Sequence, residues 1–219
     1  MPFNKNLIVL LFGLFLVMVG FGITLPVLPF YIQKLSFAKG ISPERLWLHV
    51  GLITGSYPLM QFLFSPFLGS LSDKIGRRPL ILCGLAGYSV TMFLFSISGS
   101  LIFLYVFRLL AGLFSAAFLT ASSAYIADNT TEDKRGGGMA LLVSVAGLGA
   151  VAGPLVGNVF SKANITIGQF TFDKFSLPFS ISSVLVLLVF FFSVVLSAIY
   201  ALEAVKKAAE NKPANKRKT

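Results

Sequence analysis

The sequence predicts an all-α integral membrane protein with six transmembrane helices. Hydrophobic residues make up 56% of the 219 residues and charged residues only 12%, about half the charged share of a typical soluble domain. Six apolar stretches each reach the roughly 20 residues needed to cross a bilayer. The basic residues that give the net charge of +10 lie in short runs between these stretches, not along one amphipathic face. We therefore expect the lipid bilayer as partner, and no nucleic acid.

The apolar stretches follow one another with short connections, and together they predict one helical bundle over residues 1–202. Their bounds are Leu7–Gln33, Leu46–Leu71, Pro79–Ser98, Leu101–Ala127, Gly137–Phe160 and Pro178–Leu202. The first stretch is too long for a signal peptide, and no small-residue cleavage site follows it. Residues 203–219 predict a basic tail, first a fraying helix and then disorder. We find no convincing sequence repeat between the first three stretches and the last three.

The distribution of basic residues predicts the orientation in the membrane. The N-terminus, the second–third and fourth–fifth connections and the tail carry twelve of the 18 Lys and Arg residues, and the other connections carry five. Since cytoplasmic segments are enriched in Lys and Arg, both termini are expected in the cytoplasm.

The connection between the second and third stretches reads GSLSDKIGRRP from residue 69. A cytoplasmic basic loop would explain Arg77 and Arg78 but not the remaining residues. Gly69 permits close helix approach, Gly76 permits a tight turn, and Asp73 can cap the N-terminus of a neighbouring helix. The pattern therefore indicates a loop with a defined conformation.

This loop resembles the signature loop of the major facilitator superfamily, G-x-L-x-D-x-x-G-R-R/K-x. The resemblance implies a conformational latch, in which Asp73 caps a helix of the opposite half and Arg77 pairs with an acid at the end of the fourth span. Asp128 stands at that place. The resemblance covers nearly the whole chain and implies the family's N-terminal six-helix half, built of two inverted three-helix repeats with substrate bound between the halves. The basic tail would then begin the family's central cytoplasmic loop.

Arg108 lies inside the fourth stretch, and a charge at membrane depth indicates a functional site. It stands only seven residues after Leu101, so its side chain could instead extend to the outer membrane surface. The spacing of Arg108, Gly112 and Ala116 resembles the family's span-four motif, which lines the central cavity and is linked to proton coupling. The two small residues also allow close packing of another helix.

The fifth stretch carries a stripe of glycines four residues apart: Gly149, Gly153 and Gly157. Generic packing of small residues would explain the stripe, and Pro154 adds a kink. The pattern resembles the antiporter motif of drug/proton antiporters, although Ala140 and Asn158 stand where that motif has glycine. In the family this stripe faces the opposite half, so we expect it to be left without a partner within this chain.

The first stretch, with Gly20, Thr24 and Pro26, resembles the opening of bacterial tetracycline and multidrug exporters. Some of these exporters carry an acid in mid-span, where this chain has Val17. All eight Asp and Glu residues of the chain lie in connections or at helix ends.

The resemblance favours a proton-coupled exporter of amphipathic drugs or other small molecules in a bacterial inner membrane, driven by a proton gradient and needing no bound cofactor. A non-transporting half that pairs with another chain or with itself, and a symporter for a sugar or metabolite, are the alternatives. We find no nucleophile–base pair, metal-ligand cluster or phosphate loop, so neither an enzyme nor a metal site is predicted. The one cysteine, Cys83, cannot form an intrachain disulfide.

Overall fold

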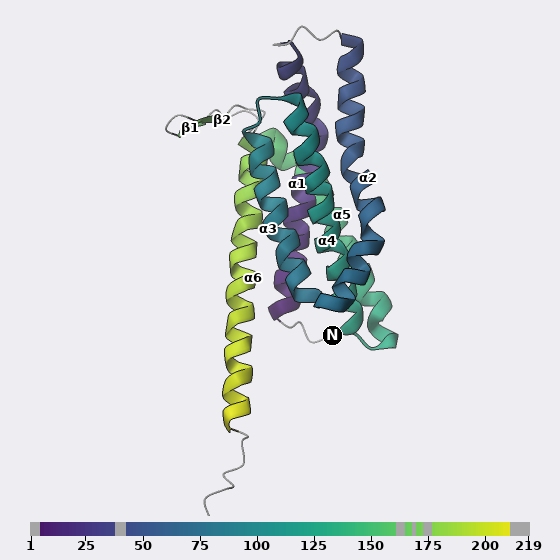
Figure 1. The fold of residues 1–219 in the computed structure, drawn as a ribbon, viewed down its shortest axis with the longest axis vertical. Coiled ribbons are helices and arrows are strands. Elements are labelled where there is room, and N and C mark those ends of the chain that lie inside the picture. The colour runs from purple at the N-terminus through teal and green to yellow at the C-terminus, as the bar shows by residue number, and fades with distance from the viewer. Residues whose placement is uncertain (1–4, 38–42, 161–164, 168–169, 173–176, 211–219) are drawn as a thin grey trace, which may run out of the picture.

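The computed structural model describes residues 5–37, 43–160, 165–167, 170–172 and 177–210. Six long helices dominate these residues: α1 (Lys5–Phe37), α2 (Pro43–Ile75), α3 (Arg77–Ser96), α4 (Leu101–Asp128), α5 (Glu132–Phe160) and α6 (Leu177–Glu210). Figure 1 shows them as one elongated bundle in which successive helices run in opposite directions. The expected all-α fold with six helices is confirmed.

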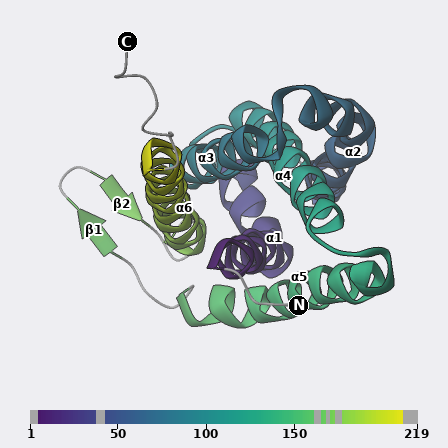
Figure 2. The same cartoon turned by 90° about the horizontal axis from the view of Figure 1, so that it is seen from below.

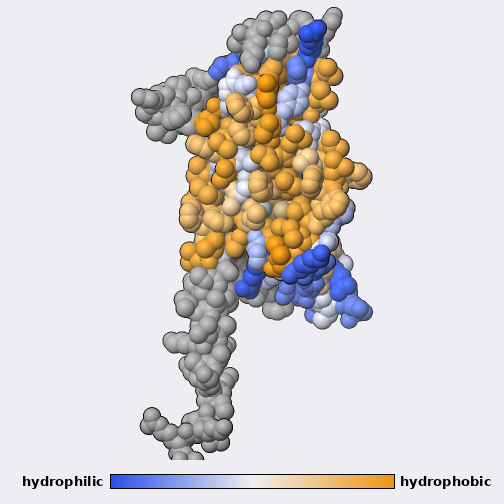
Figure 3. All heavy atoms as spheres, in the orientation of Figure 1, coloured by the Kyte–Doolittle hydropathy of each residue, from blue (hydrophilic) through white to orange (hydrophobic). Residues whose placement is uncertain are grey.

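The bundle has the surface of a membrane protein. In the described part of the chain, α1, α3, α4, α5 and α6 are long and apolar enough to cross a membrane. The second helix is long enough to cross a membrane but is less apolar, because polar residues such as His49, Tyr57 and Gln61 interrupt its apolar sequence. Figure 3 shows a broad hydrophobic band with hydrophilic residues at both ends. This band has the form that a lipid-facing surface requires.

The packing of the helices reveals the inverted repeat that the sequence does not. The main partner of α1 is α5, and that of α2 is α4. In addition, α3 packs against α4, α6 packs against α1, and α3 and α6 pack against each other. Exchanging the first three helices for the last three maps this network onto itself, with α1 replaced by α4, α2 by α5 and α3 by α6. Figure 2 shows α1 near the centre of the bundle, with α5 along one side and α2 at the far corner.

A reciprocal pair of hydrogen bonds joins α3 to α6, the two helices that the repeat exchanges with each other. The Ser89 hydroxyl donates to the backbone carbonyl of Ser183 at 2.8 Å, and the Ser183 hydroxyl donates to the carbonyl of Ser89 at 2.8 Å. Both serines are buried. Each hydroxyl therefore has an acceptor in a region without water, as polar groups at membrane depth require.

Several helices extend beyond the expected bounds. The outer connection before α6 contains a short antiparallel hairpin of β1 (Ile165–Ile167) and β2 (Phe170–Phe172). The second helix begins at Pro43 instead of Leu46, and α5 begins at Glu132 instead of Gly137. The sixth helix continues to Glu210, into the segment expected to fray. The residues after Glu210 lie outside the described part of the chain.

Candidate functional site

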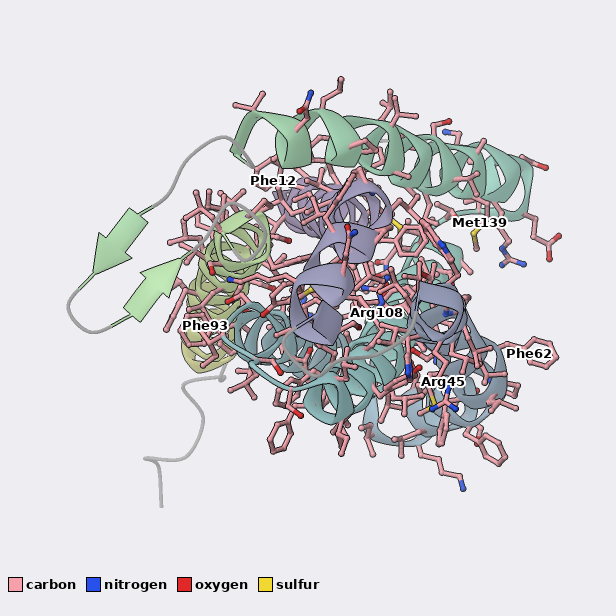
Figure 4. The ribbon with its side chains drawn as sticks, turned by 90° about the horizontal axis from the view of Figure 1, so that it is seen from above. Phe12, Arg45, Phe62, Phe93, Arg108 and Met139 are labelled. Carbon is pink, nitrogen blue, oxygen red and sulfur yellow. The ribbon has the colours of Figure 1, made fainter. Side chains whose placement is uncertain are left out.

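The centre of the bundle holds a buried cluster around Arg108, where α1, α2 and α4 meet (Figure 4). The Arg108 side chain is 0% exposed. Its Nη1 donates to the Thr24 hydroxyl of α1 at 3.2 Å. Its guanidinium carbon lies 4.6 Å from the centre of the Tyr57 ring of α2 and 5.9 Å from that of the Phe21 ring of α1. Arg108 therefore does not extend to the membrane surface, and that alternative is wrong.

Gly112 brings α2 close enough to α4 to build this cluster. A Cβ atom added at Gly112 would lie 2.5 Å from the backbone oxygen of Tyr57, so only glycine fits this contact. The close approach lets the Tyr57 hydroxyl donate to the Ser115 hydroxyl at 2.5 Å, and lets the Gln61 amide donate to the same oxygen at 3.0 Å. One turn of α4 thus separates a helix contact at Gly112 from a hydrogen-bonded polar group at Ser115.

The charge of Arg108 is only partly matched by its surroundings. The Tyr57 and Phe21 rings offer their negative faces to the cation, but aromatic rings provide no strong hydrogen-bond acceptor. Neither Nε nor Nη2 of Arg108 has a hydrogen-bond partner among the described residues. Since arginine keeps its proton in proteins, the cluster presents a permanent positive charge at membrane depth.

The junction of α2 and α3 forms a second polar cluster at the other end of α4, and only Gly76 lies between the two helices. Gly76 has φ = 94°, a conformation that side chains other than glycine rarely adopt, so the expected tight turn is present. The Nε of Arg77 donates to Asp128 Oδ2 at 2.9 Å, and its Nη1 donates to Ser72 Oγ at 3.0 Å. The end of α4 is thereby joined to the start of α3 by an ion pair.

The structure also places three other residues of this junction, but it does not test the expectation that Asp73 caps a helix of the opposite half. The Asp73 carboxylate caps no helix of the described residues and pairs with Arg77, one turn along. A Cβ added at Gly69 would make only an ordinary contact, 3.5 Å from the Thr120 methyl group, so packing within this chain does not demand glycine there. Arg78 is exposed beside them.

The glycine stripe of α5 is covered by α1, so the expectation that it lacks a partner within the chain is wrong. A Cβ added at Gly149 would lie 2.5 Å from the Phe15 oxygen, and one at Gly153 would lie 2.5 Å from the Cα of Gly22. At Gly157 the added atom would lie 3.5 Å from α1, an ordinary contact. The physical reason is that α5 crosses α1 with backbone against backbone at its middle.

The helix continues through Pro154 to Phe160, and the proline ring lies beside the contact. A Cβ added at Gly22 would lie 3.1 Å from Pro154 Cδ. The opposite face of α5 carries the exposed side chains Leu148, Val151, Leu155 and Val159. The face of α5 that has no partner among the described residues is therefore this one, not the glycine stripe.

Sequence reasoning did not identify the partners of Arg108. Tyr57, Gln61 and Ser115 are polar residues within apolar stretches, and Phe21 is one of 23 phenylalanines. Polar side chains at membrane depth were a usable signal, but their assembly around Arg108 depends on which helices pair. No signal in the sequence singles out Phe21.

Comparison with known proteins identifies the family. The model of the Major Facilitator Superfamily matches residues 10–219. The chain is 36% identical over 165 residues to the class C tetracycline resistance protein of Escherichia coli, covering 75% of this chain and 40% of that protein. It is 28% identical over 193 residues to the quinolone resistance protein NorA of Staphylococcus aureus, covering 88% of this chain and 45% of that protein.

A solved structure, that of the human organic anion transporter MFSD10, superimposes with a TM-score of 0.62 at 24% identity, covering 89% of this chain and 47% of that one. This likeness concerns the fold. The chain spans less than half the length of each of these relatives. The six-helix bundle with its inverted repeat, the α2–α3 loop and the family match lead to one conclusion: the chain belongs to the Major Facilitator Superfamily.

Proposed function

We propose that the chain is the N-terminal six-helix half of a secondary active transporter that exports amphipathic small molecules in exchange for protons. The observation that carries the proposal is the fully buried, permanently charged Arg108 at the junction of α1, α2 and α4. A buried charge at membrane depth destabilises a purely structural bundle and is typical of a transport path. The resistance proteins named above support tetracycline-like and quinolone-like substrates.

The proton carrier in this proposal lies outside the chain. Arg108 cannot release its proton at physiological pH, and the acids of the chain lie in connections or at helix ends. A titratable acid near the membrane centre therefore has to come from a second six-helix half. We propose that the second half contacts two surfaces of exposed apolar residues. One lies on α5, where Val151 is 70% and Leu155 68% exposed, and the other on α2, where Phe62 is 78% and Phe67 71% exposed.

A transport assay tests the proposal directly. Proteoliposomes receive either the purified 219-residue chain or the protein of the complete reading frame that contains it, with an imposed pH gradient and a fluorescent quinolone inside or outside. We expect gradient-driven movement only with both halves, and its loss in Arg108→Ala. Movement by the demonstrated monomer of this chain would overturn the need for a second half. A transport rate that is the same with and without the pH gradient would overturn proton coupling.

We further propose a bacterial inner-membrane location with both termini in the cytoplasm, supported by the excess of basic residues in the connections at that end. Single cysteines replace Arg45 or Lys74 in a Cys83→Ala background, and intact cells are treated with a membrane-impermeant thiol reagent. We expect labelling at position 45 and none at position 74. Labelling at position 74 in sealed cells would reverse the orientation.

A further inference from the structure

The two Arg108 nitrogens without a partner lie on the same edge of the guanidinium group. Nη1 donates to Thr24, whereas Nε and Nη2 have no hydrogen-bond partner among the described residues. The Nε–H and Nη2–H groups point in parallel, and this fork matches the two oxygens of a carboxylate.

Two aromatic rings lie next to the guanidinium group of Arg108. The Phe21 and Tyr57 rings are stacked, with centres 5.1 Å apart and planes inclined by 30°, and both lie over the guanidinium. Tyr57 is only 2% exposed, and its hydroxyl is occupied by Ser115. The side chains next to the guanidinium group therefore favour a flat apolar group beside a single negative charge.

Leaving two donors of a buried cation unpaired destabilises the protein by more than a neutral hydrogen bond does. A bound carboxylate would accept one N–H from each of these two nitrogens and would neutralise the charge. A dianion would leave one negative charge uncompensated among apolar side chains, and a cation would be repelled. Phosphate-like and cationic ligands are thereby disfavoured at this edge.

We propose that the Nε–Nη2 edge of Arg108 binds the carboxylate of an aromatic organic acid, whose ring packs against Phe21 and Tyr57. This inference rests on the proposed transport function and names the substrate class of that site. Because Arg108 is fully buried, the ligand reaches it when the Phe21–Tyr57 stack opens between α1 and α2. The carboxylate comes either from a transported ligand or from an acidic side chain of a second half, and the experiment distinguishes these two sources.

Binding of a matched pair of probes tests the proposal. Radiolabelled 2-naphthoate and its neutral, equally shaped analogue 2-naphthamide are measured by equilibrium dialysis against the 219-residue chain in lipid nanodiscs, with empty nanodiscs subtracted. We expect the acid to bind at least about tenfold more tightly than the amide, the size of a charged bidentate hydrogen bond. Equal affinities would overturn the proposal, and this comparison needs no variant.

A conservative substitution tests whether the preference for the acid over the amide comes from the Nε–Nη2 edge of Arg108. Arg108→Lys keeps the charge but cannot form the two parallel bonds, so the preference for the acid should fall to about twofold or less. Arg45→Lys makes the same change at the exposed start of α2 and should leave the preference intact. Thermal unfolding of both variants shows whether each has folded. A preference that survives in folded Arg108→Lys, or disappears in Arg45→Lys, would contradict the assignment.

The same binding measurement on the protein of the complete reading frame identifies the source of the carboxylate. If the acid preference persists there, the carboxylate belongs to the ligand. If the preference is present in the 219-residue chain and absent in the longer protein, an acidic side chain of the second half occupies the edge. Should the longer protein export a quinolone with the gradient while the chain binds acid and amide equally, this inference fails and the transport proposal stands.

Discussion

Replacing Gly153 with alanine tests the backbone contact on which the α1–α5 pair is built. The added methyl group would lie 2.5 Å from the Cα of Gly22, 2.6 Å from the Val19 oxygen and 2.7 Å from the Gly22 carbonyl carbon. All three neighbours are backbone atoms, so no side chain can rotate away to make room. The two helices therefore have to move apart.

The size of this movement follows from the distances. Carbon atoms in contact lie about 3.5 Å apart, so α1 and α5 must separate by about 1 Å, which forfeits a quarter to a half of the dispersion energy of each contact that opens. Overpacking of this kind costs about 1–3 kcal/mol. Gly157→Ala is the matched control, because its methyl group would lie 3.5 Å from Ile23. Removing the flexibility of a helical glycine there should stabilise the chain by about 0.5–1 kcal/mol.

The free energy of unfolding is measured for both variants by titrating the purified chain in micelles with a denaturing detergent and following helicity by circular dichroism. We expect Gly153→Ala to unfold at a lower detergent fraction than the native chain, and Gly157→Ala at the same or a higher one. If Gly153→Ala matches Gly157→Ala, the close α1–α5 contact does not exist in the folded protein and the reasoning is refuted.

Three further predictions use the same unfolding assay. Gly112→Ala should destabilise the chain by about 1–3 kcal/mol, since its methyl group would meet a backbone carbonyl of α2; an unchanged midpoint would contradict the α2–α4 contact. Arg77→Asp and Asp128→Arg should each lower the detergent fraction at which half of the chain unfolds at low salt, and the double reversal should restore part of the loss. The coupling energy between the two substitutions should fall as the salt concentration rises. No coupling energy at low salt would exclude this ion pair. Ser89→Ala and Ser183→Ala should each cost about 0.6 kcal/mol, because each hydroxyl donates to a backbone carbonyl of the other helix; an unchanged midpoint in either variant would show that its hydrogen bond does not form.

Hydropathy was sufficient to locate the helices, because a lipid-facing surface needs a continuous apolar stretch of the right length. It could not locate the ends of α2 and α6 beyond the apolar core, since Pro43 and Glu210 lie in polar sequence where helix propensity decides. The Gly76 turn was also predictable, because a very short connection between two helices has few possible conformations. The Arg77–Asp128 contact was predicted from the resemblance to the family's signature loop.

Helix pairing was the part that the sequence could not determine. A glycine stripe such as that of Gly149 and Gly153 shows that a helix approaches closely, but not which helix does so, and we assigned it to the wrong partner. The surroundings of Arg108 were unpredictable for the same reason. Thr24 and Tyr57 reach it only because α1 and α2 are brought to α4 by contacts elsewhere.

The glycine contacts also determine where the bundle is mechanically stiff and where it yields. At Gly153 and Gly112, backbone lies against backbone, and such crossings resist shear because no rotatable group stands between the helices. Where α1 meets α2, the stacked rings of Phe21 and Tyr57 lie between them, and rings can slide or change rotamer at little energy. We therefore expect strain applied to the bundle to move α1 relative to α2 at the Phe21–Tyr57 contact, next to the Arg108 charge. The α1–α5 and α2–α4 pairs are expected to move as rigid units.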